Sequence, residues 1–109
     1  MRAKGEGKVV KEKARFDIGQ LVRHRLFGYR GVIVDVDSVF SGMEEWYEAV
    51  ARTRPPKEQP WYHVLVSESN GQTYVAERNL EADPSREPIK HPSLRSYFSD
   101  FDGRRYLSR

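Results

Sequence analysis

The chain has 109 residues, which suits a single domain. Its residues are 38% hydrophobic and 32% charged, so we expect a small core beneath a strongly solvated surface. It contains no Cys, which excludes disulfides and thiolate chemistry, and no stretch approaches the roughly 20 apolar residues of a membrane-spanning helix. Its first residues are charged and lack the apolar core of a secretory signal, so a cytoplasmic location is the expectation.

Most of the positive charge lies at the N-terminus. The formal net charge is +3; residues 1–15 hold six basic and two acidic side chains, a net +4, so the remainder sums to −1. We expect residues 1–14 to form a disordered basic arm and residues 15–109 to form the folded domain. Such an arm can bind nucleic acid non-specifically, and it can equally be a solvated tail.

The first elements expected are two strands joined by a tight turn. Residues 20–25 alternate apolar and polar side chains, and residues 29–37 follow as a second strand. We expect Gly28 to have a positive φ in the turn and Gly31 to mark either a β-bulge or a sharp coiling of the strand. The alternation predicts two opposite faces of the second strand, with Val32, Val34 and Val36 on one and Ile33, Asp35 and Asp37 on the other.

A short amphipathic helix is predicted over residues 41–52. Ser41 and Glu44 have the spacing of a capping box, with Ser41 as the N-cap. The helix should end before Pro55. The apolar residues at helical spacing are Met43, Trp46, Tyr47 and Val50.

The second half predicts further short strands. Residues 61–68 and 73–77 read as a hairpin, with Asn70-Gly71 forming a type I′ turn. A surface loop is expected over residues 83–92 and a last strand at residues 104–107. Three aromatic residues in the segment between this loop and this strand should dock on the core: Tyr97, Phe98 and Phe101. These features predict a mainly all-β fold, a small and strongly curved SH3-like barrel or roll with one short helix.

Candidates for catalysis are few. His24, His63 and His91 are far apart in sequence and form no metal-ligand pair at short spacing. Asp35 and Asp37 lie about 7 Å apart along one strand face, which suits paired carboxylates, yet solvated strand-end acids are commoner. An enzyme would depend on Asp35, Asp37 and His63. The prediction is a protein without catalysis, cofactor or metal.

Two binding surfaces are also considered. Pro60, Trp61 and Tyr62 are either a recognition patch or core anchors, and the core is favoured for Trp61. If the first two strands pair, Arg23, Arg25 and Arg30 come close and form a phosphate-binding surface. The candidate nucleic-acid-binding residues are Arg23, His24, Arg25, Arg30, Arg52, Arg54 and Lys57, with Arg104 and Arg105 as further cations. Acids are interspersed, so composition predicts only a weak, salt-sensitive contact.

Several motifs together resemble the HspQ/YccV family of small heat-shock and hemimethylated-DNA-binding proteins. They are Phe16-Asp-Ile-Gly-Gln-Leu-Val-Arg-His24, Leu26-Phe-Gly-Tyr-Arg-Gly31, Pro60-Trp-Tyr-His-Val64, Tyr74-Val-Ala-Glu77 and Asn79-Leu80. The resemblance covers roughly residues 15–107. It implies a non-enzymatic, β-rich regulatory protein of the heat-shock response whose partners include hemimethylated DNA. The alternative it implies is a Lon-type protease adaptor, or specificity enhancer, that acts by protein–protein contact.

The resemblance also implies an ATP-dependent protease or the replication initiator protein as partner, and exposed sheet edges make a homo-oligomer plausible. Three features of the surface discriminate among the hypotheses. An apolar patch away from the arginines favours a protein partner, and a continuous basic face favours DNA. An enzyme requires a concave pocket that holds His63 and a carboxylate.

Overall fold

The computed structural model describes residues 14–51 and 53–109, and the mainly all-β prediction is confirmed. The predicted arm at residues 1–14 lies, apart from Ala14, outside the described residues. None of the described helices is long and apolar enough to cross a membrane. The elements in chain order are β1 (Leu21–His24), β2 (Arg30–Asp37), α1 (Glu44–Val50), β3 (Trp61–Val66), β4 (Gln72–Ala76), η2 (Glu77–Asn79), β5 (Leu80–Ala82), α2 (Leu94–Tyr97), β6 (Phe98–Phe101) and β7 (Tyr106–Ser108).

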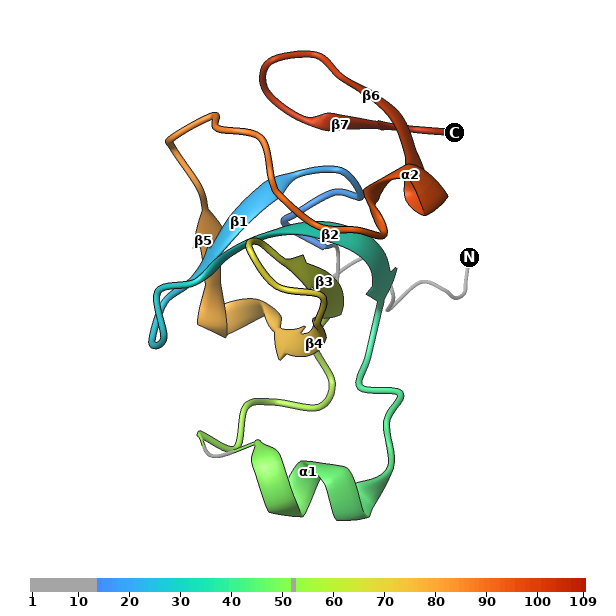
Figure 1. Cartoon of the computed structure of the whole chain (residues 1–109). Helices are drawn as coiled ribbons and strands as arrows, with labels where there is room; N and C mark the ends of the chain where they lie inside the picture. The colour runs from blue at the N-terminus through green and yellow to red at the C-terminus, as the bar shows by residue number, and fades with distance from the viewer. Residues whose placement is uncertain (1–13, 52) are drawn as a thin grey trace, which may run out of the picture.

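Five strands form one antiparallel sheet in the order β4-β3-β2-β1-β5, and β6 pairs with β7 in a separate hairpin. In Figure 1 the β6–β7 hairpin lies at one end of the molecule and α1 at the other. Because β4 and β5 are the two sheet edges, the sheet does not close, and the predicted barrel is corrected to an open sheet.

The sheet is nevertheless strongly curved, and the chain length between its edges explains why. Ala76 ends one edge strand and Leu80 begins the other, with only η2 between them. Four residue steps reach at most about 14 Å. Five flat strands would separate the edge strands by about 19 Å. The sheet must therefore bend to bring its two edges within reach of η2.

Buried side chains gather in three clusters. One cluster comprises Phe16, Val22, Ile33, Tyr62, Val64, Val75 and Leu80. A second comprises Leu21, Val32, Val34, Leu65, Ile89, Phe98 and Tyr106, and it joins the sheet to the C-terminal segment. The docking predicted for Phe98 and Phe101 is confirmed, since Phe98 is buried there and Phe101 packs against it, whereas Tyr97 remains exposed. The third cluster, around Trp61, lies against α1.

A bulge in β2 lies at a different residue from the one predicted. The register with β3 shifts between Ile33 and Asp35, so Val34 is the extra residue. Beyond it, Val36 packs with the cluster of Ile33, and the prediction that Val36 shares a face with Val34 is wrong. Gly31 instead allows the close approach of β3. A Cβ at this position would overlap the Val64 side chain and lie 2.5 Å from the Leu65 carbonyl oxygen.

The predicted capping box is also wrong. The helix begins at Glu44, its N-cap is Met43, and no side chain caps it. The Ser41 hydroxyl instead donates to the Val39 carbonyl. Such a local hydrogen bond to the backbone competes with capping of the helix. Of the predicted apolar stripe, Tyr47 is buried, while Met43 is 69% exposed and Val50 is 48% exposed.

The β3–β4 hairpin is confirmed, but its turn differs from the predicted type. Neither Asn70 nor Gly71 has a positive φ; the left-handed residue is Glu68, with φ 62°. The Ser69 hydroxyl bonds the Val66 carbonyl and the Gly71 N–H, so the loop closes through a side chain. At the β1–β2 turn, Gly28 has φ 79° as predicted.

Candidate functional site: an apolar groove at the sheet edge

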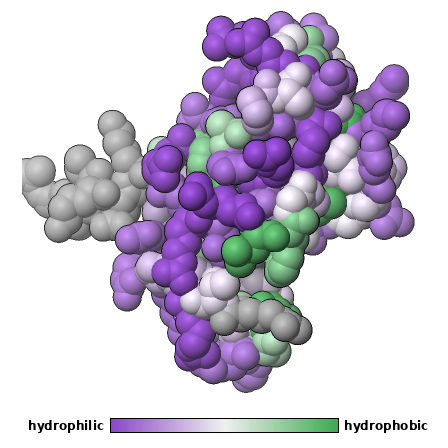
Figure 2. Space-filling model, turned by 90° about the vertical axis from the view of Figure 1, so that its left-hand side faces the viewer, coloured by the Kyte–Doolittle hydropathy of each residue, from purple (hydrophilic) through white to green (hydrophobic). Residues whose placement is uncertain are grey.

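A groove of about 680 Å³ runs along the edge strand β4, and every residue of β4 lines it. One wall comes from the β1–β2 turn, with Leu26, Phe27 and Tyr29. The other wall comes from the C-terminal end of α1 and the loop after it, with Val50 and Pro55 among its residues. Figure 2 views the side on which the β1–β2 turn projects, and hydrophobic side chains gather there above the part that carries α1. Three segments distant in sequence thus build the groove.

The turn wall is held by His24, which is buried. Its Nδ1 accepts hydrogen bonds from the backbone N–H groups of Leu26 and Phe27, both at 3.1 Å, and its ring stacks on Phe27 at 4.6 Å. Burial lowers the pKa of His24, which favours the neutral ring that can accept these bonds. The turn therefore presents Leu26 and Phe27 outward, 58% and 71% exposed.

An aromatic cluster supports the opposite wall. Trp61 is 1% exposed, and its ring centroid lies 4.9 Å from that of Phe40 and 5.2 Å from that of Tyr74. Its Nε1 donates to the Pro56 carbonyl. The prediction that Trp61 belongs to the core is confirmed. Because Pro60, Trp61 and Tyr62 are all buried, the alternative of an exposed recognition patch formed by these three is wrong.

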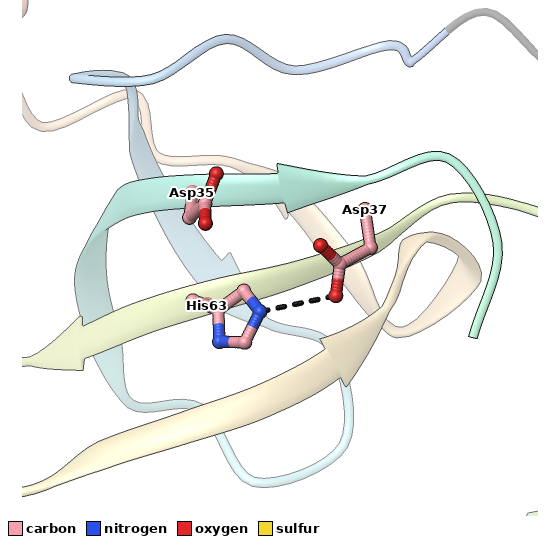
Figure 3. A group of neighbouring side chains, drawn as sticks. All are labelled: Asp35, Asp37 and His63. Atoms are coloured by element: carbon pink, nitrogen blue, oxygen red, sulfur yellow. Dashed lines mark hydrogen bonds and ion pairs between the residues drawn. The ribbon is translucent and has the colours of Figure 1, made fainter. Parts of the chain in front are cut away.

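Asp35, Asp37 and His63 come together beside the groove, and their candidate ligand atoms lie within 4.8 Å of one another. In Figure 3 the Asp37 carboxylate reaches the His63 ring, at 3.1 Å from Nε2. The same Asp37 oxygen accepts a 2.6 Å hydrogen bond from the Tyr74 hydroxyl. Burial and this bond raise the pKa of Tyr74 to about 12. These three residues could offer ligands to a metal ion, but the contacts shown tie β2, β3 and β4 together.

The catalytic alternative required a concave pocket holding both His63 and a carboxylate. His63 lines the groove, but neither Asp35 nor Asp37 does. Asp35 is exposed, and Asp37 is engaged by His63 and Tyr74. Among the described lining residues, the groove therefore does not combine His63 with a carboxylate.

The predicted arginines of the first hairpin do come together. Arg23 lies opposite Arg30 in the β1–β2 register. Each also has an acidic partner: Arg23 and Arg25 approach Glu81 at 2.7 and 3.9 Å, and Arg30 approaches Asp83 at 2.6 Å. These pairs neutralise much of the positive charge that a phosphate backbone would meet.

Burial opposes ionisation of Asp83, but hydrogen bonds from Arg30 and Ser85 together outweigh it and lower its pKa. Asp83 is therefore the ionised partner of Arg30 at neutral pH, and Arg30 is held by a charge-assisted bond. His24, the remaining predicted residue of this hairpin, faces inward rather than toward solvent.

The other predicted cations lie on the loop after α1. Arg54 makes two hydrogen bonds to Glu48, at 3.0 and 3.2 Å, and Lys57 pairs with Glu44 at 2.5 Å. Arg52 lies outside the described residues. Within the described ranges, five of the predicted cations thus each have a carboxylate within 4 Å and do not form an unneutralised basic face: Arg23, Arg25, Arg30, Arg54 and Lys57. Of the two further cations, Arg105 approaches Asp17 at 3.5 Å.

A family model described as hemimethylated DNA-binding protein, YccV like, matches residues 14–105 of the chain. The chain belongs to the YccV-like family. The match starts just before the first buried residue, Phe16, and ends next to β7. It therefore includes the whole five-stranded sheet, α1 and both walls of the groove, so the groove is part of the YccV-like domain of this protein.

The sequence offered an apolar patch or an exposed edge for a protein partner, but it did not place the groove along β4 of this YccV-like domain. One signal was present: Leu26 and Phe27 are apolar and adjoin the turn at Gly28, where polar residues are usual. Two large apolar residues at a turn have little core to reach, and here they form a groove wall.

Proposed function

We propose that this YccV-like protein is a non-enzymatic regulator of the heat-shock type that binds a protein partner in the groove along β4. The partner class we favour is an ATP-dependent Lon-type protease or a protein that it degrades, so the protein would act as an adaptor. The single observation that carries this proposal is the uncharged groove: within the described residues, none of those lining it is Asp, Glu, Lys or Arg.

The composition of the groove supports a protein partner. Trp46 and Tyr74 line it with partly exposed side chains, and Trp and Tyr are enriched among residues that dominate protein–protein affinity. Phe27 and Leu26 project from the turn wall with no core to enter, and exposed apolar patches of this kind mark interaction sites. Arg23, Arg25 and Arg30, which pair with Glu81 and Asp83, are not among the described residues that line the groove.

We expect that Leu26→Glu combined with Val50→Glu abolishes most regulatory activity. Each substitution places a carboxylate on one wall, and desolvating these charges should weaken partner binding about tenfold or more. The measurement is the rate at which a purified Lon-type protease with ATP degrades an unfolded protein, with and without this protein. Both residues are exposed, so the fold should persist, which circular dichroism would verify.

The matched control is Leu107→Glu, which changes an exposed leucine on β7, at the opposite end of the molecule from α1 (Figure 1). It should stimulate degradation as the wild type does. If the wild type leaves the rate unchanged, the adaptor proposal is wrong. If the groove variant stimulates as well as the wild type, the groove is not the binding site.

A second candidate, favoured by the family to which the chain belongs, is binding of hemimethylated DNA. The test is fluorescence anisotropy with hemimethylated, fully methylated and unmethylated GATC duplexes at two salt concentrations. Because Arg23 and Arg25 already share Glu81, we expect their joint replacement by Ala to change affinity less than about threefold, within the range of exposed ion pairs.

Removal of residues 1–14 separates two kinds of DNA contact. Preference for the hemimethylated duplex that survives the truncation would support methyl reading by the domain. Equal binding of all three duplexes that falls steeply with salt and disappears with the truncation would indicate non-specific contact by basic residues, and it would contradict this candidate.

A further inference from the structure

The backbone of β4 has unused hydrogen-bonding groups on its outer edge. Bonds from Val66 N–H to the Gly71 carbonyl and from Glu77 N–H to the Pro60 carbonyl flank the β3–β4 ladder. Because bonded and non-bonded pairs alternate in an antiparallel ladder, Thr73 and Val75 are the β4 residues bonded to β3. The intervening residues therefore direct their backbone groups away from β3.

Those outward groups belong to Gln72, Tyr74 and Ala76. Among the described residues, no partner accepts from their three N–H groups, and none donates to the carbonyls of Gln72 and Tyr74. The close approach of the His63 and Tyr74 rings, at 4.5 Å between centroids, agrees with a non-hydrogen-bonded pair at that position. Gln72 is exposed and Tyr74 is partly exposed, whereas Ala76 is buried, so the accessible part of this edge lies at Gln72 and Tyr74. Exposed strand edges are templates for another strand.

The groove surrounds this edge from both sides. Leu26, Phe27 and Tyr29 flank one face of β4, and Trp46 and Val50 flank the other. Successive side chains of an added strand would point alternately to the two walls, and both walls are apolar. A segment with apolar residues at successive positions would therefore pack its side chains against both walls. Its backbone would form hydrogen bonds with the outward groups of β4.

Nucleic acid does not fit this edge. A phosphate backbone needs cationic groups, and the lining residues within the described ranges include no Lys or Arg. Unpaired backbone N–H and carbonyl groups in a row have their natural complement in another polypeptide in extended conformation.

We propose that the groove binds an extended, uncharged and apolar polypeptide segment that adds to β4 as a sixth strand of the sheet. This mode rests on the protein-binding function proposed above and specifies how the partner is held. The three residues of β4 that are not buried, Gln72 to Tyr74, span about 10 Å, so about three residues of the segment would pair with them. Backbone bonds supply affinity without reading sequence, and the two walls select apolar side chains.

Gln72 allows the edge to be blocked without disturbing the sheet. Its own N–H faces outward, so Gln72→Pro removes a donor that β3 does not use. The preceding residue is Gly71, which has no Cβ to clash with the proline ring. Gln72→Ala is the matched control, since it removes the exposed side chain and keeps the N–H.

The probe is a fluorescently labelled peptide with the core Val-Phe-Val-Leu-Val and one lysine at each end. Its binding is measured by anisotropy. We expect Gln72→Pro to weaken binding about tenfold and Gln72→Ala to change it less than about twofold, as the loss of one or two hydrogen bonds implies. The same peptide N-methylated at alternate residues, which keeps its side chains, should also lose affinity.

Amide hydrogen exchange gives a second readout that a side-chain-only contact would not produce. On saturation with the peptide, exchange should slow at Gln72 and Tyr74. It should change little at Thr73 and Val75, whose N–H groups already bond to β3. Protection that does not alternate along β4 would overturn the proposal.

The remaining outcomes separate this inference from the function on which it rests. If Leu26→Glu with Val50→Glu abolishes regulation while Gln72→Pro binds the probe and regulates like the wild type, the groove functions but strand addition is wrong. If neither variant affects regulation, the proposed function fails as well. If sedimentation shows that two copies pair through β4 and exclude the peptide, the occupant is a second copy, and the peptide proposal is overturned.

Discussion

Replacing Trp61 by Ala is expected to lower the free energy of unfolding by about 3–5 kcal/mol, the range for deleting a buried aromatic side chain. The indole is fully buried, touches the rings of Phe40 and Tyr74, and donates to the Pro56 carbonyl. Its loss leaves a cavity between the sheet and α1 and an unsatisfied carbonyl. The measurement is urea denaturation followed by far-ultraviolet circular dichroism.

Trp46→Ala is the control for this substitution. Trp46 belongs to the same cluster but is only half-buried, so its removal should cost clearly less than that of Trp61. A Trp61 variant that loses under about 1 kcal/mol, or no more than the Trp46 variant, would show that the cluster is not a core element.

Gly31→Ala is expected to destabilise the protein by about 2–3 kcal/mol, although it adds a single methyl group. The added Cβ would overlap the Val64 side chain and approach the Leu65 carbonyl oxygen at 2.5 Å. Gly31 lies on the central strand β2, paired with Val66 on one side and Val22 on the other, so the backbone of β3 can retreat only by breaking ladder bonds. The midpoint of thermal unfolding, measured by calorimetry, reports the loss.

Gly71→Ala controls for the general effect of replacing a strand-end glycine by alanine. A Cβ at Gly71 meets only the Ser69 hydroxyl at 3.6 Å, and its φ is not positive. This variant should stay within about 0.5 kcal/mol of the wild type, as surface substitutions usually do. Equal stability of the two variants would mean that the close approach of β3 to Gly31 does not contribute to the free energy of unfolding.

Local patterns predicted the strands because alternation and turn residues act over short distances. The hairpin of β3 and β4 and the positive φ of Gly28 follow from such signals. The details that failed depend on partners distant in sequence. The bulge at Val34 is set by the register with β3, and Glu68 takes the left-handed position in a loop where its N–H meets the Lys90 carbonyl.

The candidate site was less predictable than the fold for the same reason. The clustering of Arg23 and Arg30 followed from pairing two adjacent strands. The neutralisation of these arginines could not be predicted in this way. Their partners Glu81 and Asp83 lie on β5 and the segment after it, more than fifty residues further along the chain. The groove depends on β4, the β1–β2 turn and the end of α1 with the loop after it, and an open edge is a property of the whole sheet order rather than of any segment.

The position of the two tryptophans has a practical consequence. Trp46 and Trp61 are the two tryptophans of the chain, and both line the groove. With selective excitation of tryptophan, the emission of the protein therefore arises from these two side chains. A segment that fills the groove would exclude water from the indole of Trp46 and shift the emission maximum, so occupancy could be followed in unmodified protein, at native concentration and in real time.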